Sequence, residues 1–109
     1  METEALEASM HEIKANKQPI GKVDNPIPFA SHIIPNAEGT IFYLFTDGFA
    51  DQFGGEKGKK FKYKQLKQIL QNNFHLPFKE QEVLLKKTFE IWQGKLEQVD
   101  DVCIIGFRL

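Results

Sequence analysis

The feature that most constrains this chain is the apolar run Ile41–Thr46, which ends at the dipeptide Asp47-Gly48. Alternate residues of the run would point to opposite faces of a strand, and both sets are mostly apolar, as in an interior strand covered on both sides. A carboxylate directly after such a strand is held on a rigid support. Asp47 is therefore a candidate metal ligand or catalytic acid, although Asp-Gly alone is also a common turn dipeptide.

A second acidic corner, Asp100-Asp101, directly precedes the last apolar run, Val102–Phe107. If the two runs pair as antiparallel strands, both acidic corners lie at the same edge of the sheet. Asp47 and Asp100 would then face one cavity, where two carboxylates repel each other unless a cation lies between them. Mg²⁺ and Mn²⁺ prefer oxygen ligands. The two corners together predict a metal site, whereas either corner alone is more typical of a turn or a solvated strand end.

The remaining periodicities predict an α+β fold. Apolar residues at three- and four-residue steps predict helices over residues 62–74 and 78–93, and Gly94 caps the second helix. We expect a short edge strand at 11–17 and a strand at 29–35 that forms a hairpin with the central run. Strands clustered in sequence and helices grouped together favour two helices on one face of a mostly antiparallel sheet.

Length and composition set further limits. A chain of 109 residues is one domain or part of one. We expect a flexible segment at 1–11 and a folded part at 12–109. The net charge of −1 gives no field that favours nucleic acid. The single cysteine, Cys103, excludes an internal disulfide and fits a reducing cytoplasm, and within a strand we expect it to be buried and inert. No apolar run approaches the roughly 18 residues of a membrane span.

Two other features contain residue types that bind phosphate or metal ions. Residues 54–60 are rich in Gly and Lys, but only three residues separate Gly54 from Gly58, and Lys60 stands where a phosphate-binding P-loop has a hydroxyl. We expect a mobile basic loop there, either solvated or acting as a flap that attracts a phosphoprotein. The histidines share no metal-ligand spacing; they are His11, His32 and His75.

Four segments carry a recognisable pattern: Leu44–Asp51, Phe53–Gly55, Trp92–Gly94 and Gln98–Gly106. Together they resemble the C-terminal half of bacterial PPM-type serine/threonine protein phosphatases, and Lys17–Gly21 is similar to that family's upstream Pro-(Leu/Ile)-Gly segment. The branch that is most similar contains the sporulation stage II phosphatase E and the phosphatases that regulate sigma-factor antagonists. The resemblance covers roughly residues 12–109 and is specific in the combination, order and spacing of its motifs.

The resemblance implies a β-sandwich of two antiparallel sheets flanked by helices. It also implies hydrolysis of phosphoserine or phosphothreonine on a protein by a water that Mn²⁺ or Mg²⁺ activates, in bacterial signal transduction. By position, Asp47 and Asp100 would be the metal ligands, with Gly48 and Asp101 in supporting roles. Asp51 matches a frequently acidic position to which the resemblance assigns no role.

The chain also departs from the family pattern. The family's longer domain has an upstream half with a further metal-binding Asp-Gly and a Gly-His-Gly, whereas the only Asp-Gly of this chain is Asp47-Gly48. We therefore expect the C-terminal part of a longer enzyme, whose upstream domains would decide any membrane attachment, and an isolated chain with little or no activity. The alternative is a non-catalytic regulatory or interaction module that forms a homodimer through unpaired sheet surface.

Overall fold

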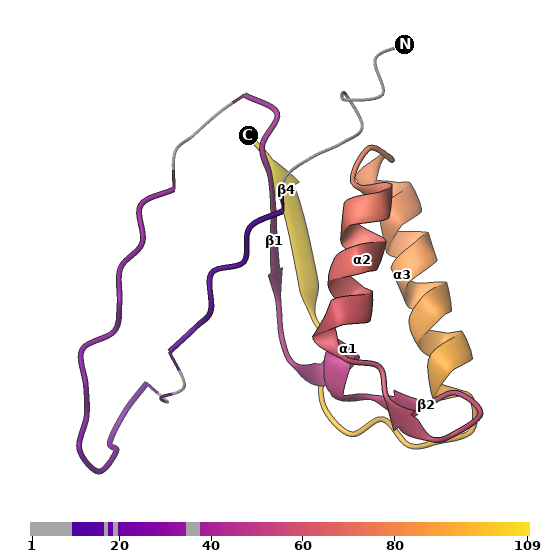
Figure 1. Ribbon diagram of the computed structural model, residues 1–109, viewed down its shortest axis with the longest axis horizontal. Helices are drawn as coiled ribbons and strands as arrows, with labels where there is room; N and C mark the ends of the chain where they lie inside the picture. Colours follow the sequence, from indigo (N-terminus) through magenta and orange to yellow (C-terminus); the bar gives the residue numbers. More distant parts are fainter. Residues whose placement is uncertain (1–9, 17, 19, 35–37) are drawn as a thin grey trace.

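The computed structural model describes residues 10–16, 18, 20–34 and 38–109 (Figure 1). In chain order its elements are β1 (Ile41–Phe45), α1 (Gly48–Asp51), β2 (Phe53–Gly54), β3 (Lys59–Lys60), α2 (Tyr63–Asn73), α3 (Phe78–Gln93) and β4 (Ile104–Arg108). The α+β class is confirmed, and both long helices lie where the periodicity predicts them. No helix in the described residues is long and apolar enough to span a bilayer.

The two apolar runs pair as antiparallel strands, as expected. In this ladder Ile41 lies opposite Arg108 and Phe45 lies opposite Ile104. The rings of Phe42 and Phe107 stack across the two strands with centroids 5.2 Å apart, which is the kind of cross-strand pair that stabilises a ladder. The ends of β1 and β4 that carry the acidic corners therefore lie at the same edge of the sheet.

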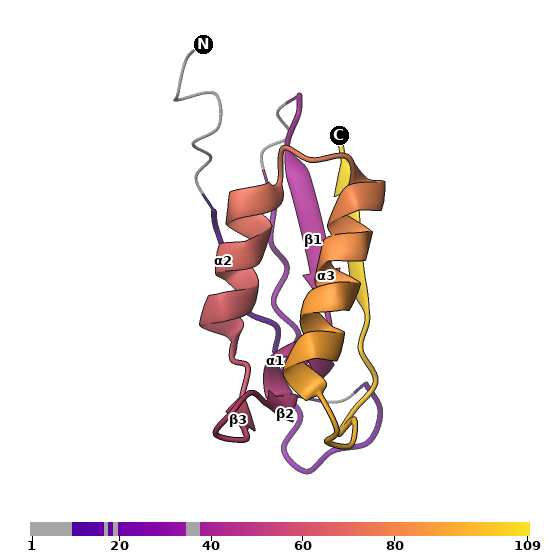
Figure 2. The same cartoon turned by 90° about the vertical axis from the view of Figure 1, so that its right-hand side faces the viewer.

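Helices α2 and α3 lie side by side on one face of this sheet (Figures 1 and 2). The hydroxyl of Tyr43 on β1 donates a hydrogen bond of 2.5 Å to Oε1 of Gln81 on α3. Gln81 is buried, and its Nε2 donates to the carbonyl oxygens of Phe74 and Leu76 in the connection between the helices. One buried amide thus ties the sheet to both helices.

The core lies between α1 and the two long helices, next to the acidic end of the sheet. Its buried members include Phe49, Phe61 and Leu66. The ring of Phe49 meets the edges of Phe61 and Phe89 at centroid distances of 5.2 and 5.1 Å, a favoured aromatic geometry. Because Phe49 follows the first acidic corner by two residues, this packing holds that corner firmly.

The other face of the sheet is uncovered in the described structure. Leu44 is 58% exposed and Ile105 is 52% exposed. The prediction that the Ile41–Thr46 run is covered on both sides is therefore wrong here, because the helices cover only the face of Tyr43. Cys103 is also exposed, contrary to the expectation of a buried thiol, because it precedes Ile105 by two residues and shares its side of the strand.

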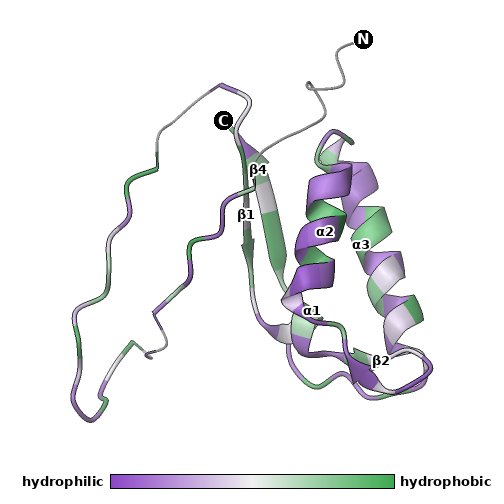
Figure 3. Cartoon of the chain, in the orientation of Figure 1, coloured by the Kyte–Doolittle hydropathy of each residue, from purple (hydrophilic) through white to green (hydrophobic). Residues whose placement is uncertain are grey.

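The described residues between 10 and 34 form an extended arm in which hydrophobic and hydrophilic residues alternate (Figures 1 and 3). The described residues of 11–17 and 29–35 contain no strand, so those two strand predictions are wrong; Lys17, Pro35 and residues 1–9 lie outside the described residues. Side-chain amides, rather than a backbone ladder, connect the two halves of the arm. Asn16 Oδ1 accepts from the amide of Ala30 at 2.8 Å.

Residues 54–60, expected to be a mobile loop, lie largely within the β2–β3 hairpin. Phe53 pairs with Lys60 across it, and the amide of Gly55 donates to the carbonyl oxygen of Trp92 at 2.9 Å. A Cβ on Gly54 would lie 1.9 Å from that same oxygen. Glycine is therefore required for the hairpin to approach the end of α3 so closely.

Replacing Leu66 with Ala tests this core. Leu66 is 0% exposed, so we expect Leu66→Ala to lower the free energy of unfolding by about 2–5 kcal/mol, measured by urea denaturation. Ile91 is 74% exposed, and Ile91→Ala should change the free energy of unfolding by no more than about 0.5 kcal/mol. Equal effects of the two substitutions would contradict this location of the core.

Candidate metal centre

The first acidic corner connects the end of β1 to α1. Asp47 is exposed, and its carbonyl oxygen accepts a hydrogen bond of 2.9 Å from the amide of Asp51. This bond closes the single helical turn of α1. The Asp47 carboxylate is thereby carried on a short rigid bend rather than on a long loop.

Thr46 ties the two corners together. Its amide donates to the carbonyl oxygen of Cys103 at 3.0 Å, so the β1–β4 pairing continues one residue past the strands. Its hydroxyl accepts from the amide of Cys103 at 3.1 Å and donates to the carbonyl oxygen of Asp101 at 3.1 Å. The residue before Asp47 therefore touches the residue after Asp100.

Gly48 brings the corners into direct contact. It is buried, and a Cβ on it would lie 2.2 Å from the carbonyl oxygen of Asp101. Any side chain here would push the corners apart, so the Asp-Gly sequence has a steric reason beyond turn formation. The structure thus brings the surroundings of Asp47 and Asp101 together, as the pairing of the strands predicts.

The second corner lines a shallow hollow of about 510 Å³, formed by residues 98–101. Both aspartates are exposed. Oδ1 of Asp100 accepts a hydrogen bond of 2.8 Å from the amide of Asp101, and the carbonyl oxygen of Asp100 accepts one of 2.8 Å from Nε2 of Gln98. These bonds order the corner while both carboxylates stay accessible from solvent.

Tyr63, the first residue of α2, contacts the first corner from the helix layer. Its hydroxyl donates to Oδ1 of Asp47, and its ring lies 5.8 Å from that of Phe45. Burial raises the pKa of Tyr63 above its ordinary value, and the hydrogen bond to Asp47 raises that pKa further. The hydroxyl therefore keeps its proton at neutral pH and remains a donor.

Gln52 connects the two corners through the protein interior. It is 0% exposed. Its Nε2 donates to the carbonyl oxygen of Glu97 at 2.8 Å and its Oε1 accepts from the amide of Val99 at 3.3 Å. Its own carbonyl oxygen accepts from Nε1 of Trp92 at 2.8 Å. The segment leading to Asp100 is thus hydrogen-bonded to the residue that follows α1.

Sequence reasoning missed the contributions of Tyr63 and Gln52. Tyr63 belongs to the apolar stripe of its helix, so its pattern predicts core packing and gives no sign of the polar contact. Gln52 has no pattern at all, because its partners are more than forty positions away in the sequence. Asp51, to which the resemblance assigns no role, forms an exposed ion pair of 3.7 Å with Lys60. Among the described residues, no histidine joins a cluster that could hold a metal.

The donor chemistry fits part of a site for Mg²⁺ or Mn²⁺. Asp47 and Asp100 offer the carboxylate oxygens that these cations prefer. Within residues 10–16, 18, 20–34 and 38–109, however, no three His, Cys, Asp or Glu side chains converge into a group that could hold a metal. These two carboxylates therefore supply at most a fraction of a coordination sphere.

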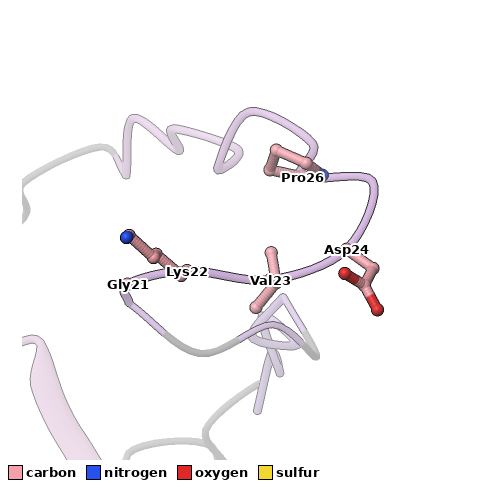
Figure 4. Close-up of a pocket in the computed structure, with 5 residues that line it drawn as sticks. All are labelled: Gly21, Lys22, Val23, Asp24 and Pro26. Atoms are coloured by element: carbon pink, nitrogen blue, oxygen red, sulfur yellow. The ribbon is translucent and has the colours of Figure 1, made fainter.

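A second hollow, of about 750 Å³, lies at the tip of the arm (Figure 4). It is lined by Gly21, Lys22, Val23, Asp24 and Pro26. The charged ends of Lys22 and Asp24 point in different directions in Figure 4. Since no polar groups converge there, this hollow lacks the character of a binding site.

Comparison with known proteins agrees with this geometry. Among solved structures, the chain is similar to the SiaA-PP2C domain of Pseudomonas aeruginosa, with a TM-score of 0.67 and 39% sequence identity over 70% of this chain. The fold is thus that of part of a PP2C-type phosphatase domain, as the sequence resemblance implies. The chain belongs to the family Stage II sporulation protein E (SpoIIE), whose profile matches residues 6–109.

The chain spans 31% of the length of that solved structure. No curated protein matches it. The matched region includes both acidic corners, because the family profile runs from residue 6 to residue 109.

Replacing Gln52 tests the link between the corners. Gln52→Met keeps the side-chain volume but leaves Glu97 and Val99 without their hydrogen-bond partner. We therefore expect it to lower the free energy of unfolding by at least about 2 kcal/mol. Hydrogen exchange at the Val99 amide should accelerate. Gln93 is a matched control, since its Nε2 makes one exposed bond of 2.9 Å to Leu96, and Gln93→Met should cost about 1 kcal/mol or less. Unchanged Val99 exchange in Gln52→Met would contradict the link.

Proposed function

We propose that this chain supplies one part of the active site of a metal-dependent serine/threonine protein phosphatase, with Asp47 and Asp100 as ligands of Mn²⁺ or Mg²⁺. One observation carries the proposal above all. Thr46 and Gly48, on either side of Asp47, are in direct contact with Asp101. Asp101 is the residue that follows Asp100. Membership of a phosphatase family supports the choice of phosphate ester hydrolysis over other metal chemistry.

Bound Mn²⁺ or Mg²⁺ would supply an activated water and neutralise charge on the phosphoryl group. The chain's own residues would hold the ligands. Gly48 permits the close approach of the corners, and the amide of Asp101 orients the carboxylate of Asp100. Both ligands are exposed, which suits a substrate as large as a phosphorylated protein.

The substrate in this proposal is a bacterial phosphoprotein of a cytoplasmic signalling pathway, such as a sigma-factor regulator. The β2–β3 hairpin offers Lys57 and Lys59 as exposed positive charges. Such charges near an anionic site raise the local concentration of a phosphorylated segment. The adjacent Lys60 is already paired with Asp51 and contributes less.

A second candidate function is that of an interaction module. The uncovered sheet face favours it, because Leu44, Ile105 and Phe107 are exposed together with Phe42 stacked among them. An apolar face of this kind favours association. In this reading the chain forms a homodimer through the sheet and has no metal site of its own.

A titration with Mn²⁺ separates the two candidates. We expect the chain to bind Mn²⁺ weakly by calorimetry, and both Asp47→Asn and Asp100→Asn to abolish binding because each removes a charged ligand of the same site. Asp51→Asn is the control, since Asp51 is paired with Lys60, and it should bind as the wild type does. No binding by the wild type at millimolar Mn²⁺ would contradict the metal site and favour the interaction module.

The partial ligand set predicts little catalysis by the 109-residue chain alone. Two carboxylates hold a divalent cation poorly, so we expect no turnover of p-nitrophenyl phosphate above the rate of free Mn²⁺ in buffer. Asp47→Asn should then give the same rate as the wild type. Robust turnover that depends on both Mn²⁺ and Asp47 would contradict this expectation, because it would mean that this chain holds a complete site.

A further inference from the structure

We propose that Tyr63 is a positioning residue for the site, which fixes the carboxylate of Asp47 so that one of its oxygens faces the cation. This inference rests on the proposed function, because it takes Asp47 as a metal ligand. The proposal adds Tyr63, the first residue of α2, which lies outside the acidic motifs. Its basis is the hydrogen bond from the Tyr63 hydroxyl to Oδ1 of Asp47.

The ring of Tyr63 is held in place by packing that does not involve Asp47. It packs at an interplanar angle of 44° against Phe45, the last residue of β1. Tyr63 is half-buried, whereas Asp47 is exposed. The hydrogen bond therefore connects an ordered aromatic ring to a carboxylate that solvent would otherwise leave free to rotate.

The backbone before Tyr63 is also anchored to the acidic corner. The amide of Lys62 donates to the carbonyl oxygen of Ala50 in α1 at 2.8 Å. The amide of Phe61 donates to the carbonyl oxygen of Gln52 at 3.0 Å. Lys62 has a φ of 78°, a conformation that non-glycine residues adopt only where the surrounding structure holds them. The start of α2 is thus fixed relative to the turn that carries Asp47.

The chemistry of the donor suits a metal ligand. A phenol hydroxyl is neutral, so it occupies one oxygen of Asp47 and leaves the negative charge and the second oxygen, Oδ2, for a cation. A lysine in the same place would compete with the cation for that charge. Groups that orient metal ligands in this way typically change metal affinity by about 10–100-fold when they are removed.

Two tyrosine variants test the proposal. Tyr63→Phe removes only the hydroxyl and keeps the ring against Phe45. Tyr43→Phe is the matched control, because it removes a tyrosine hydroxyl of β1 that donates to Gln81 and not to an acidic corner. Both variants should show the wild-type far-UV circular dichroism, so any difference at Asp47 reports the lost hydroxyl and not unfolding.

The first measurement needs no metal. Three-bond NMR couplings across χ1 of Asp47 should show one rotamer in the wild type and in Tyr43→Phe, and rotamer averaging in Tyr63→Phe. A merely structural role of Tyr63 would leave these couplings unchanged. One Asp47 rotamer in Tyr63→Phe, or averaging already in the wild type, would overturn the inference whatever the metal result.

The second measurement is the Mn²⁺ concentration that half-broadens the NMR signals of residues 46–48. We expect this concentration to rise at least tenfold in Tyr63→Phe and to stay unchanged in Tyr43→Phe. If Asp47→Asn abolishes the broadening while Tyr63→Phe leaves it as in the wild type, the inference is wrong and the metal site stands. If Mn²⁺ broadens none of these signals in the wild type, the metal site itself is wrong and the positioning role with it.

Discussion

The contact between Gly48 and the carbonyl oxygen of Asp101 is the constraint on which the candidate site depends. It exists only because β1 and β4 pair in one register, with Phe45 opposite Ile104 and Thr46 continuing the pairing to Cys103. A slip of one residue would turn every side chain of a strand to the other face. The same slip would separate the two corners, so the register of the sheet fixes the site as well as the core.

Two further supports hold the corners from within. Phe49 packs into the aromatic core directly after the first corner, and the buried amide of Gln52 binds the segment before the second corner. Each support originates in α1 or the residue that follows it. A single helical turn therefore connects the packing of the core to the placement of both acidic segments, which explains how exposed carboxylates can be held in an ordered arrangement.

Local sequence patterns predicted the elements whose formation depends on local periodicity. The two long helices and the pairing of β1 with β4 follow from alternation and from three- and four-residue steps. The strand expected at 29–35 and the two-sided burial of Ile41–Thr46 both require a further layer of structure, and the described residues contain none. The antiparallel pairing of β1 with β4 brings the strand ends that lead to the two acidic corners to one edge of the sheet, as predicted. The contacts of Tyr63 and Gln52 join residues far apart in sequence and leave no local signal.

The charges around the corners distinguish the candidate ligands from other acids of the chain. Asp51 is one turn away from Asp47 and is paired with Lys60. In the part of the chain that the structure describes, Asp47, Asp100 and Asp101 form no ion pair with a basic side chain, and Asp47 and Asp100 are hydrogen-bonded by a neutral hydroxyl and a backbone amide. Neutral donors order a carboxylate without cancelling its charge. In the proposed metal site, carboxylates in this state would repel one another, and a divalent cation between them would remove that repulsion.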